Sequence, residues 1–218
     1  LARELIGGRM LAWPRPIVDA VPEIVGHRGR PVVVLASGDP FHYGVGDMLL
    51  RAIPAAETLC LPQPSSFSLA AARMGWSLQH VITVSLHGRP LEGIVRHLHS
   101  GARLLALSWD GETPDRLARL LVARGMGEST ITVLEALGGP NENLRTTTAA
   151  GFDLVDVAAL NIMALEIVAS IQATPIGLAA GLDDALFEHD GQLTKRAIRA
   201  VIEEMRDRKS TRLNSSHL

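Results

Sequence analysis

The residues best suited to bind a ligand lie in one loop, residues 37–46, with the sequence SGDPFHYGVG. Asp39 supplies a carboxylate that can accept hydrogen bonds from an amine or from ribose hydroxyls, and His42 follows in the same loop. Gly38 and Gly44 allow a backbone to approach a ligand closely. The loop follows a short apolar run and precedes a predicted helix. This order predicts a position at the carboxyl end of a strand, where α/β proteins bind ligands.

The same loop departs from the two common phosphate-binding motifs. Leu49 replaces the third glycine of a Gly-x-Gly-x-x-Gly pattern, and no Gly-Lys-Ser or Gly-Lys-Thr follows. A carboxylate at Asp39 would also repel a phosphate, so the preferred ligand is cationic or rich in hydroxyl groups. An NAD-dependent oxidoreductase is disfavoured for these reasons. The alternative to a binding loop is a tight turn in which Asp39 accepts hydrogen bonds only from backbone amides.

Two further motifs carry polar residues at the start of a predicted helix. In PQPSSFSLAAA, residues 62–72, Ser65 and Ser66 stand beside free amide donors that could hold a ligand carboxylate. The alternative is an ordinary helix cap followed by an alanine-rich helix that packs on a sheet. The segment 108–114, SWDGETP, repeats the outline of the first loop, because an apolar run, an acid, a glycine and a proline precede a helix. This repetition indicates two α/β halves that face a shared cleft.

Short apolar runs alternate with helical patterns along the chain, which predicts an α/β fold with strands covered on both faces. Thr113 is expected to cap one helix, with Gly125 past its end, and Gly75 is expected to end another. We expect strands at residues 31–36, 58–61, 81–85, 103–108, 130–134 and 160–168, and helices at residues 46–52, 66–74, 90–99, 114–124 and 192–206.

The composition excludes several classes of protein. The 218 residues are 47% hydrophobic and 20% charged, which suffices for a core in one large or two small domains. The net charge is -2 with acids and bases interleaved, so we expect no nucleic acid partner. The longest apolar runs fall short of the roughly 20 residues that span a bilayer, so we expect a soluble protein that is not exported. The single cysteine, Cys60, fits a reducing cytoplasm.

A metal site is not expected. His97 and His99 are the densest pair among the eight histidines, but a spacing of two on a helix points their rings to different faces. Cys60 has no second thiol with which to form a Cys-x-x-Cys zinc pair.

Several of these motifs occur in the order found in one protein family. LASGDPFHYGVG resembles a glycine-aspartate-proline loop and LPQPSSFSLAAARMGWSLQ a Pro-x-x-Ser-Ser helix start, and SLHGRP, SWDGETP, VLEALGGPNE and LNIMALE follow. The joint pattern covers residues 7–169. It is similar to the tetrapyrrole methylases, S-adenosylmethionine-dependent methyltransferases that act on corrin precursors. The resemblance implies C-methylation of a precorrin in cobalamin biosynthesis, with S-adenosylmethionine as the cofactor.

The resemblance also implies how the chain is organised. It implies the tetrapyrrole methylase fold, with α/β domains at residues 1–84 and 85–171 and the cofactor in a cleft between them. Residues 172–208 are expected to form a linker and the truncated start of a second methyltransferase module, and residues 209–218 a non-native tail. The family's first strand and glycine-rich loop are expected to precede Leu1. The implied assembly is a cytoplasmic homodimer.

Carried over residue by residue, the resemblance implies a set of cofactor-binding residues but no catalytic residue. The sulfonium methyl is already activated, so a dedicated base is unnecessary, and Asp39 and Tyr43 are the polar residues to test. His87 is open between a plain loop position and a role beside the acidic substrate. The residues implied to line the S-adenosylmethionine pocket are Ser37, Gly38, Asp39, His42, Ser65, Ser66, Trp109, Leu137 and Gly138.

Two other functions stay open at this point. The chain could be a methylase of a different precorrin, because the family motifs do not identify the ring position. It could also be a non-catalytic α/β ligand-binding module, because no base or nucleophile is identifiable in the sequence. Methyl transfer to a precorrin would exclude the second alternative.

Overall fold

The chain forms two compact units, Leu1–Gly75 and Trp76–Leu218, in a computed structural model that describes residues 10–173, 195 and 198. The predicted helix at 192–206, most of the linker at 172–208 and the tail at 209–218 lie outside the described residues. No helix among the described residues is long and apolar enough to cross a membrane.

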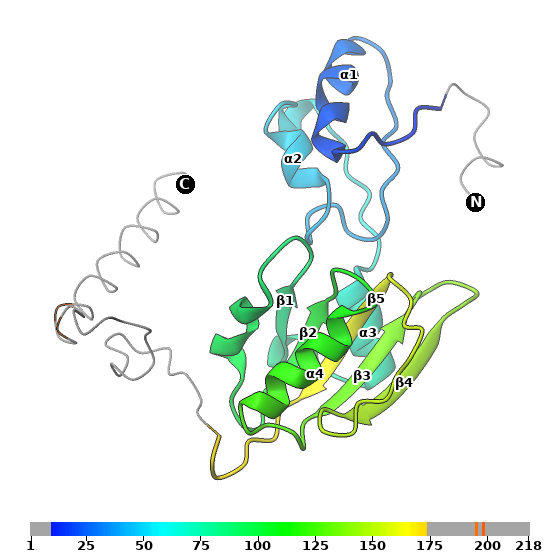
Figure 1. Ribbon diagram of the computed structural model, residues 1–218. Coiled ribbons are helices and arrows are strands. Elements are labelled where there is room, and N and C mark those ends of the chain that lie inside the picture. The colour runs from blue at the N-terminus through cyan, green and yellow to red at the C-terminus, as the bar shows by residue number, and fades with distance from the viewer. Residues whose placement is uncertain (1–9, 174–194, 196–197, 199–218) are drawn as a thin grey trace. The chain divides into compact units, whose positions relative to one another are not determined.

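The second unit is built on a mixed sheet of five strands with the order β1-β2-β5-β3-β4 (Figure 1). β1 and β2 are parallel, whereas β5 is antiparallel to both of its neighbours and β4 is antiparallel to β3. Because β5 runs against β2 and β3, the carboxyl ends of β1, β2 and β3 meet at one edge of the sheet. The strands are β1 (Ile82–Ser85), β2 (Arg103–Leu107), β3 (Thr130–Glu135), β4 (Asn143–Thr148) and β5 (Asn161–Glu166).

One face of this sheet packs against α4 (Thr113–Ala123) and the 3-10 helix η5 (Leu91–His97). Figure 1 shows α4 lying across this face. Leu117 and Leu121, one turn apart on α4, are fully buried, and each such burial stabilises the fold by about 1.5–3 kcal/mol. The strands contribute every second residue to the same core, as their pleat requires. These strand residues are Leu104, Ala106, Ile131, Val133, Met163 and Leu165.

Four strands of the second unit were predictable from apolar runs. The predicted strands at 81–85, 103–108, 130–134 and 160–168 are confirmed as β1, β2, β3 and β5, with ends shifted by one or two residues. β4 was not predicted. It pairs only with β3 at the end of the sheet, and its residues are mostly exposed and polar, so it carries no apolar run.

Two expectations for helices in the second unit need correction. The helix predicted at 90–99 is a 3-10 helix, η5, and it is shorter than expected. Gly93, inside the segment, weakens an α-helix, which favours the short 3-10 form. α4 begins at Thr113 rather than being capped by it, and Gly125 follows the helix as predicted. The short 3-10 helix η4 (Leu78–His80) precedes β1.

The described part of the first unit is helical. α3 has the predicted bounds, with the Ser65 side chain as its cap and Gly75 in the left-handed conformation at its end, φ 67°. The predicted helix at 46–52 is confirmed as the shorter α2, whereas α1 was not predicted. The elements are η2 (Ile17–Asp19), α1 (Ala20–Gly26), α2 (Gly46–Leu50), η3 (Ala55–Glu57) and α3 (Ser66–Met74).

The predicted strands at 31–36 and 58–61 are wrong. Both segments are irregular, and no backbone ladder joins either of them to another described segment. A strand is stable only when its N–H and C=O groups pair with a neighbouring strand, and apolar composition alone cannot supply that partner. Val33 is 82% exposed and Leu59 is 85% exposed, so the apolar residues that suggested burial face solvent here.

Candidate functional site

The loop at residues 37–46 forms a tight turn that is held by its own backbone hydrogen bonds. The N–H of Gly46 donates to the carbonyl of Pro40 at 2.8 Å, and the N–H of His42 donates to the carbonyl of Asp39 at 3.2 Å. A Cβ added to Gly44 would lie 2.6 Å from the Pro40 oxygen, which is too close for any real side chain. The loop's own turn therefore requires glycine at position 44, so this residue alone does not indicate a close approach to a ligand.

Asp39 stabilises this turn with one of its two carboxylate oxygens. Its Oδ1 accepts a hydrogen bond from the N–H of Phe41 at 2.8 Å, which is the contact expected of a plain turn. Its other oxygen accepts no hydrogen bond from any residue that the structure describes. Asp39 is half-buried. One oxygen thus holds the loop, and the other can accept a hydrogen bond from a ligand.

The loop meets the start of α3, so two motifs that are separate in the sequence come together. His42 Nδ1 lies 3.2 Å from Ser65 Oγ, and the N–H of Gln63 donates to the carbonyl of Gly38 at 3.3 Å. Ser65 Oγ also accepts the N–H of Ser68, so this serine caps the helix. Gly38 has a φ of 68°, a conformation that favours glycine. Ser37 and Ser66 are exposed on the same two segments.

An aromatic cluster supports this junction. The imidazole of His42 stacks on Phe67 with a centroid distance of 4.6 Å, and Tyr43 lies 5.5 Å from His42 and 5.7 Å from Phe67. Phe67 is 1% exposed and was missed as a site residue. The signal for its burial was present, because Phe67, Ala70 and Ala71 have the spacing of one helix face. The stack fixes the plane of the His42 ring.

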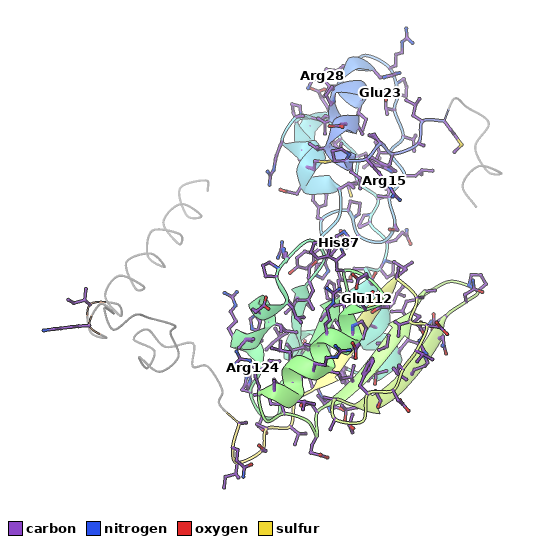
Figure 2. All side chains as sticks on the ribbon, viewed as in Figure 1. Arg15, Glu23, Arg28, His87, Glu112 and Arg124 are labelled. Atoms are coloured by element: carbon purple, nitrogen blue, oxygen red, sulfur yellow. The ribbon has the colours of Figure 1, made fainter. Side chains whose placement is uncertain are left out.

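The remaining implied residues lie in the second unit, at the edge where β1, β2 and β3 end. Trp109 follows β2 and is 54% exposed, and its ring centroid lies 6.4 Å from that of His87, which follows β1. Leu137 and Gly138 follow β3. Figure 2 shows His87 and Glu112 at this edge and Arg124 toward the opposite end of α4. The structure thus divides the nine implied residues between two units, six in the first and three in the second.

Ser108, which precedes Trp109 in the sequence, forms a buried contact with Asn161 at this edge. Ser108 Oγ donates to Asn161 Oδ1, and Asn161 Nδ2 donates to the backbone carbonyls of Asp110 at 3.2 Å and Ala158 at 2.8 Å. Every polar group of the Asn161 side chain is therefore paired. Sequence analysis missed Asn161, because it stands at the start of an apolar strand where spacing gives no signal.

Glu135 is a buried carboxylate at the end of β3. Its Oε1 accepts the N–H of Ala158 at 2.7 Å, and both of its oxygens accept bonds from Arg145. Asn143 donates to its Oε2 at 3.0 Å. Burial opposes ionisation of Glu135, but the Ala158 amide and Arg145 outweigh it, and the pKa of Glu135 lies below its ordinary value. Glu135 was also missed, although an acid that ends an apolar run is a visible anomaly.

Asp110 lies two residues before Glu112, the N-cap of α4, at the same edge. Its Oδ1 accepts the N–H of Thr113 at 2.8 Å and that of Glu112 at 3.0 Å, and Arg116 donates to both of its oxygens. Hydrogen bonds from Arg116 and Thr113 lower the pKa of Asp110. This carboxylate is therefore committed to the helix start and is not available to a ligand. Among the described residues, no three His, Cys, Asp or Glu side chains are grouped closely enough to hold a metal ion.

Known proteins resemble this chain at the level of sequence. A family model described as Tetrapyrrole (Corrin/Porphyrin) Methylases matches residues 14–153. The chain is 56% identical over 201 residues to a curated Sinorhizobium protein named precorrin-6Y C(5,15)-methyltransferase (decarboxylating). That alignment covers 92% of this chain and 49% of the relative. The chain thus spans about half the length of this curated relative.

Solved structures resemble the fold. The precorrin-6Y methylase of Archaeoglobus fulgidus matches with a TM-score of 0.52 and 25% identity, and the match covers 74% of each chain. Uroporphyrin-III C-methyl transferase from Thermus thermophilus, complexed with S-adenyl homocysteine, matches with a TM-score of 0.57 and 19% identity over 74% of this chain and 78% of that one. The α/β fold predicted from the sequence is confirmed.

Proposed function

Since the chain belongs to the tetrapyrrole (corrin/porphyrin) methylases, we propose that it binds S-adenosylmethionine and methylates a ring carbon of a precorrin. The contact between His42 and Ser65 carries this proposal, because it joins the two motifs that the family resemblance assigns to the cofactor. The structure of the Thermus transferase with S-adenyl homocysteine supports the choice of cofactor.

The residues of the first unit fit the cofactor by their chemistry. S-adenosylmethionine carries an amine and two ribose hydroxyls, and the second oxygen of Asp39 is an acceptor for such donors. When bound, the cofactor supplies a methyl group that is already activated on a sulfonium. The work left to this chain is to hold the cofactor and to exclude water, so no residue is assigned as a base. Trp109, Leu137 and Gly138 are also proposed as cofactor contacts.

The proposed reaction is the precorrin-6Y C5,15-methylation step of cobalamin biosynthesis. A curated relative that is 56% identical carries that name, which supports this substrate over another precorrin. Because the chain spans about half of that relative, we assign one methylation to it and the decarboxylation to the remaining half. We also propose a cytoplasmic homodimer. Light scattering after size-exclusion chromatography should give twice the mass of one chain, and a monomer would contradict this part.

Calorimetric titration with S-adenosylhomocysteine tests the cofactor site. We expect saturable binding to the unaltered chain, no binding of NAD, and weaker binding after Asp39→Ala. Asp47→Ala is the matched control, because Asp47 lies on the adjoining α2 and pairs with the exposed Arg51. Loss of affinity in Asp39→Ala alone would support the proposal. Absence of saturable binding to the unaltered chain would overturn it.

A further inference from the structure

We propose that Glu135 and Asn161 are positioning residues for the cofactor site, and that they act by clamping the segment 155–158 at the edge of the sheet. This inference rests on the proposed function, because Trp109, Leu137 and Gly138 are cofactor contacts only under that proposal. Neither Glu135 nor Asn161 is required to touch the cofactor. Their role is to hold fixed the two loops that do.

Glu135 and Asn161 both form hydrogen bonds with the backbone of Ala158. Ala158 donates its backbone N–H to Glu135 Oε1 at 2.7 Å, and its carbonyl accepts from Asn161 Nδ2 at 2.8 Å. Glu135 and Asn161 are register partners on β3 and β5, so the two side chains reach the segment from neighbouring strands. Arg145, which is bidentate on Glu135, also donates to the carbonyl of Val155 at 2.8 Å. The segment is thereby held at both of its ends.

The same side chains anchor the loops that carry the implied contacts. Asn161 bonds the side chain of Ser108 and the carbonyl of Asp110, which are the residues on either side of Trp109. Glu135 immediately precedes Ala136, whose φ of 47° turns the chain toward Leu137 and Gly138. A movement of Glu135 or Asn161 would therefore move both loops. Binding groups must be held within about 0.5 Å of the productive geometry, so such a movement weakens the site.

Close packing at Gly111 supports the same arrangement independently. A Cβ added to Gly111 would overlap the carbonyl oxygen of Val157, so the loop after β2 lies directly against the clamped segment. The two segments together line an open pocket at this edge. Its lining residues are Asp110, Gly111, Glu112, Asp156 and Val157.

Paired measurements of affinity and stability test the inference. Glu135→Gln removes the charge that Arg145 pairs with, and Asn161→Asp replaces the amide that donates to Ala158 and Asp110. We expect each variant to bind S-adenosylhomocysteine about tenfold more weakly, since a displacement of about 1 Å in a binding group costs this much or more. Gly111→Ala displaces the same segment from its other side and should weaken binding similarly. It also serves as the test if Glu135→Gln fails to fold.

Two control variants separate positioning from general stability. Glu166→Gln breaks an ion pair with Arg103 at the opposite edge of the sheet. Thr132→Val breaks a partly buried contact between the hydroxyls of Thr132 on β3 and Thr146 on β4. Both should lower the melting temperature while affinity changes less than about twofold, because neither contact reaches the edge loops.

These measurements distinguish failure of the inference from failure of the proposed function. If the unaltered chain binds S-adenosylhomocysteine and the folded Glu135→Gln, Asn161→Asp and Gly111→Ala variants bind it equally well, the inference is overturned and the proposed function stands. Equal loss of affinity in the control variants would also overturn the inference, because it would show a general effect of stability. If the unaltered chain does not bind, the proposed function fails and the inference fails with it.

Discussion

His42 and Ser65 lie 23 positions apart in the sequence, and their side chains meet at 3.2 Å. Because Ser65 also accepts the N–H of Ser68, one hydroxyl caps α3 and joins that helix to the loop at residues 37–46. The helix start and the loop therefore depend on each other.

Replacing Ser65 should destabilise the protein, whereas replacing its neighbour should not. Ser65→Ala removes the cap of α3 and the contact with His42, and loss of such a cap costs about 1 kcal/mol of unfolding free energy. Ser66→Ala is the matched control, because Ser66 is exposed. Denaturant unfolding followed by circular dichroism would measure both. A loss of the same size in both variants would contradict the capping role.

Glu135 should make stability depend on pH in the acidic range. Its pKa is lower in the folded protein than in the unfolded chain, so its contribution is fully present above the unfolded value and is lost as the pH falls through the folded value. We expect the free energy of unfolding to fall more steeply in the unaltered protein than in Glu135→Gln as the pH drops below the ordinary pKa of a glutamate. Parallel curves for the two proteins would contradict this.

Gly44 should not tolerate alanine, because an added Cβ would press on the Pro40 oxygen at 2.6 Å. We expect Gly44→Ala to lower the free energy of unfolding by about 1–3 kcal/mol, as overpacking does, and to weaken S-adenosylhomocysteine binding. Gly93→Ala is the control, since a Cβ there meets nothing within 4 Å and restricts the unfolded chain. Thermal unfolding would separate the two. An unaffected Gly44→Ala variant would show that the loop is not wound as described.

Trp109 should matter for binding more than for stability. Trp109 is 54% exposed, so Trp109→Ala removes little buried area and should change the melting temperature only slightly. The same variant should weaken S-adenosylhomocysteine binding and remove part of the change in tryptophan fluorescence on titration. Trp109→Phe keeps an aromatic surface and should retain most of the affinity. Unchanged affinity in Trp109→Ala would exclude the ring as a cofactor contact.

Sequence reasoning predicted the secondary structure correctly where the hydrophobicity of neighbouring residues reflects their burial. The apolar runs at 103–108 and 130–134 predicted buried strands, because both faces of β2 and β3 are buried. The similar apolar run at 31–36 gave a wrong prediction of a strand. Apolar character alone does not indicate whether a neighbouring strand is available for pairing. β4 was invisible because an exposed end strand needs no apolar residues.

The sequence motifs of the candidate site could be predicted, but the contacts between them could not. The glycine-aspartate-proline loop and the two serines were found from spacing and turn chemistry. Their junction through His42, and the bonds of Glu135 and Asn161 to Ala158, depend on contacts between distant parts of the chain. Sequence periodicity gives no information about which distant residue a single polar residue at a strand end will contact.

The place of β5 in the sheet has a consequence for the width of the proposed binding edge. Neighbouring strands lie about 4.8 Å apart, so inserting β5 separates the ends of β2 and β3 by about 9.6 Å. The loops after these strands therefore begin two strand spacings apart, and the segment 155–158, which leads into β5, lies between them, against Gly111 on one side and Glu135 on the other. If β2 and β3 were direct neighbours, their loops would begin only about 5 Å apart, and the segment 155–158 could not lie between them.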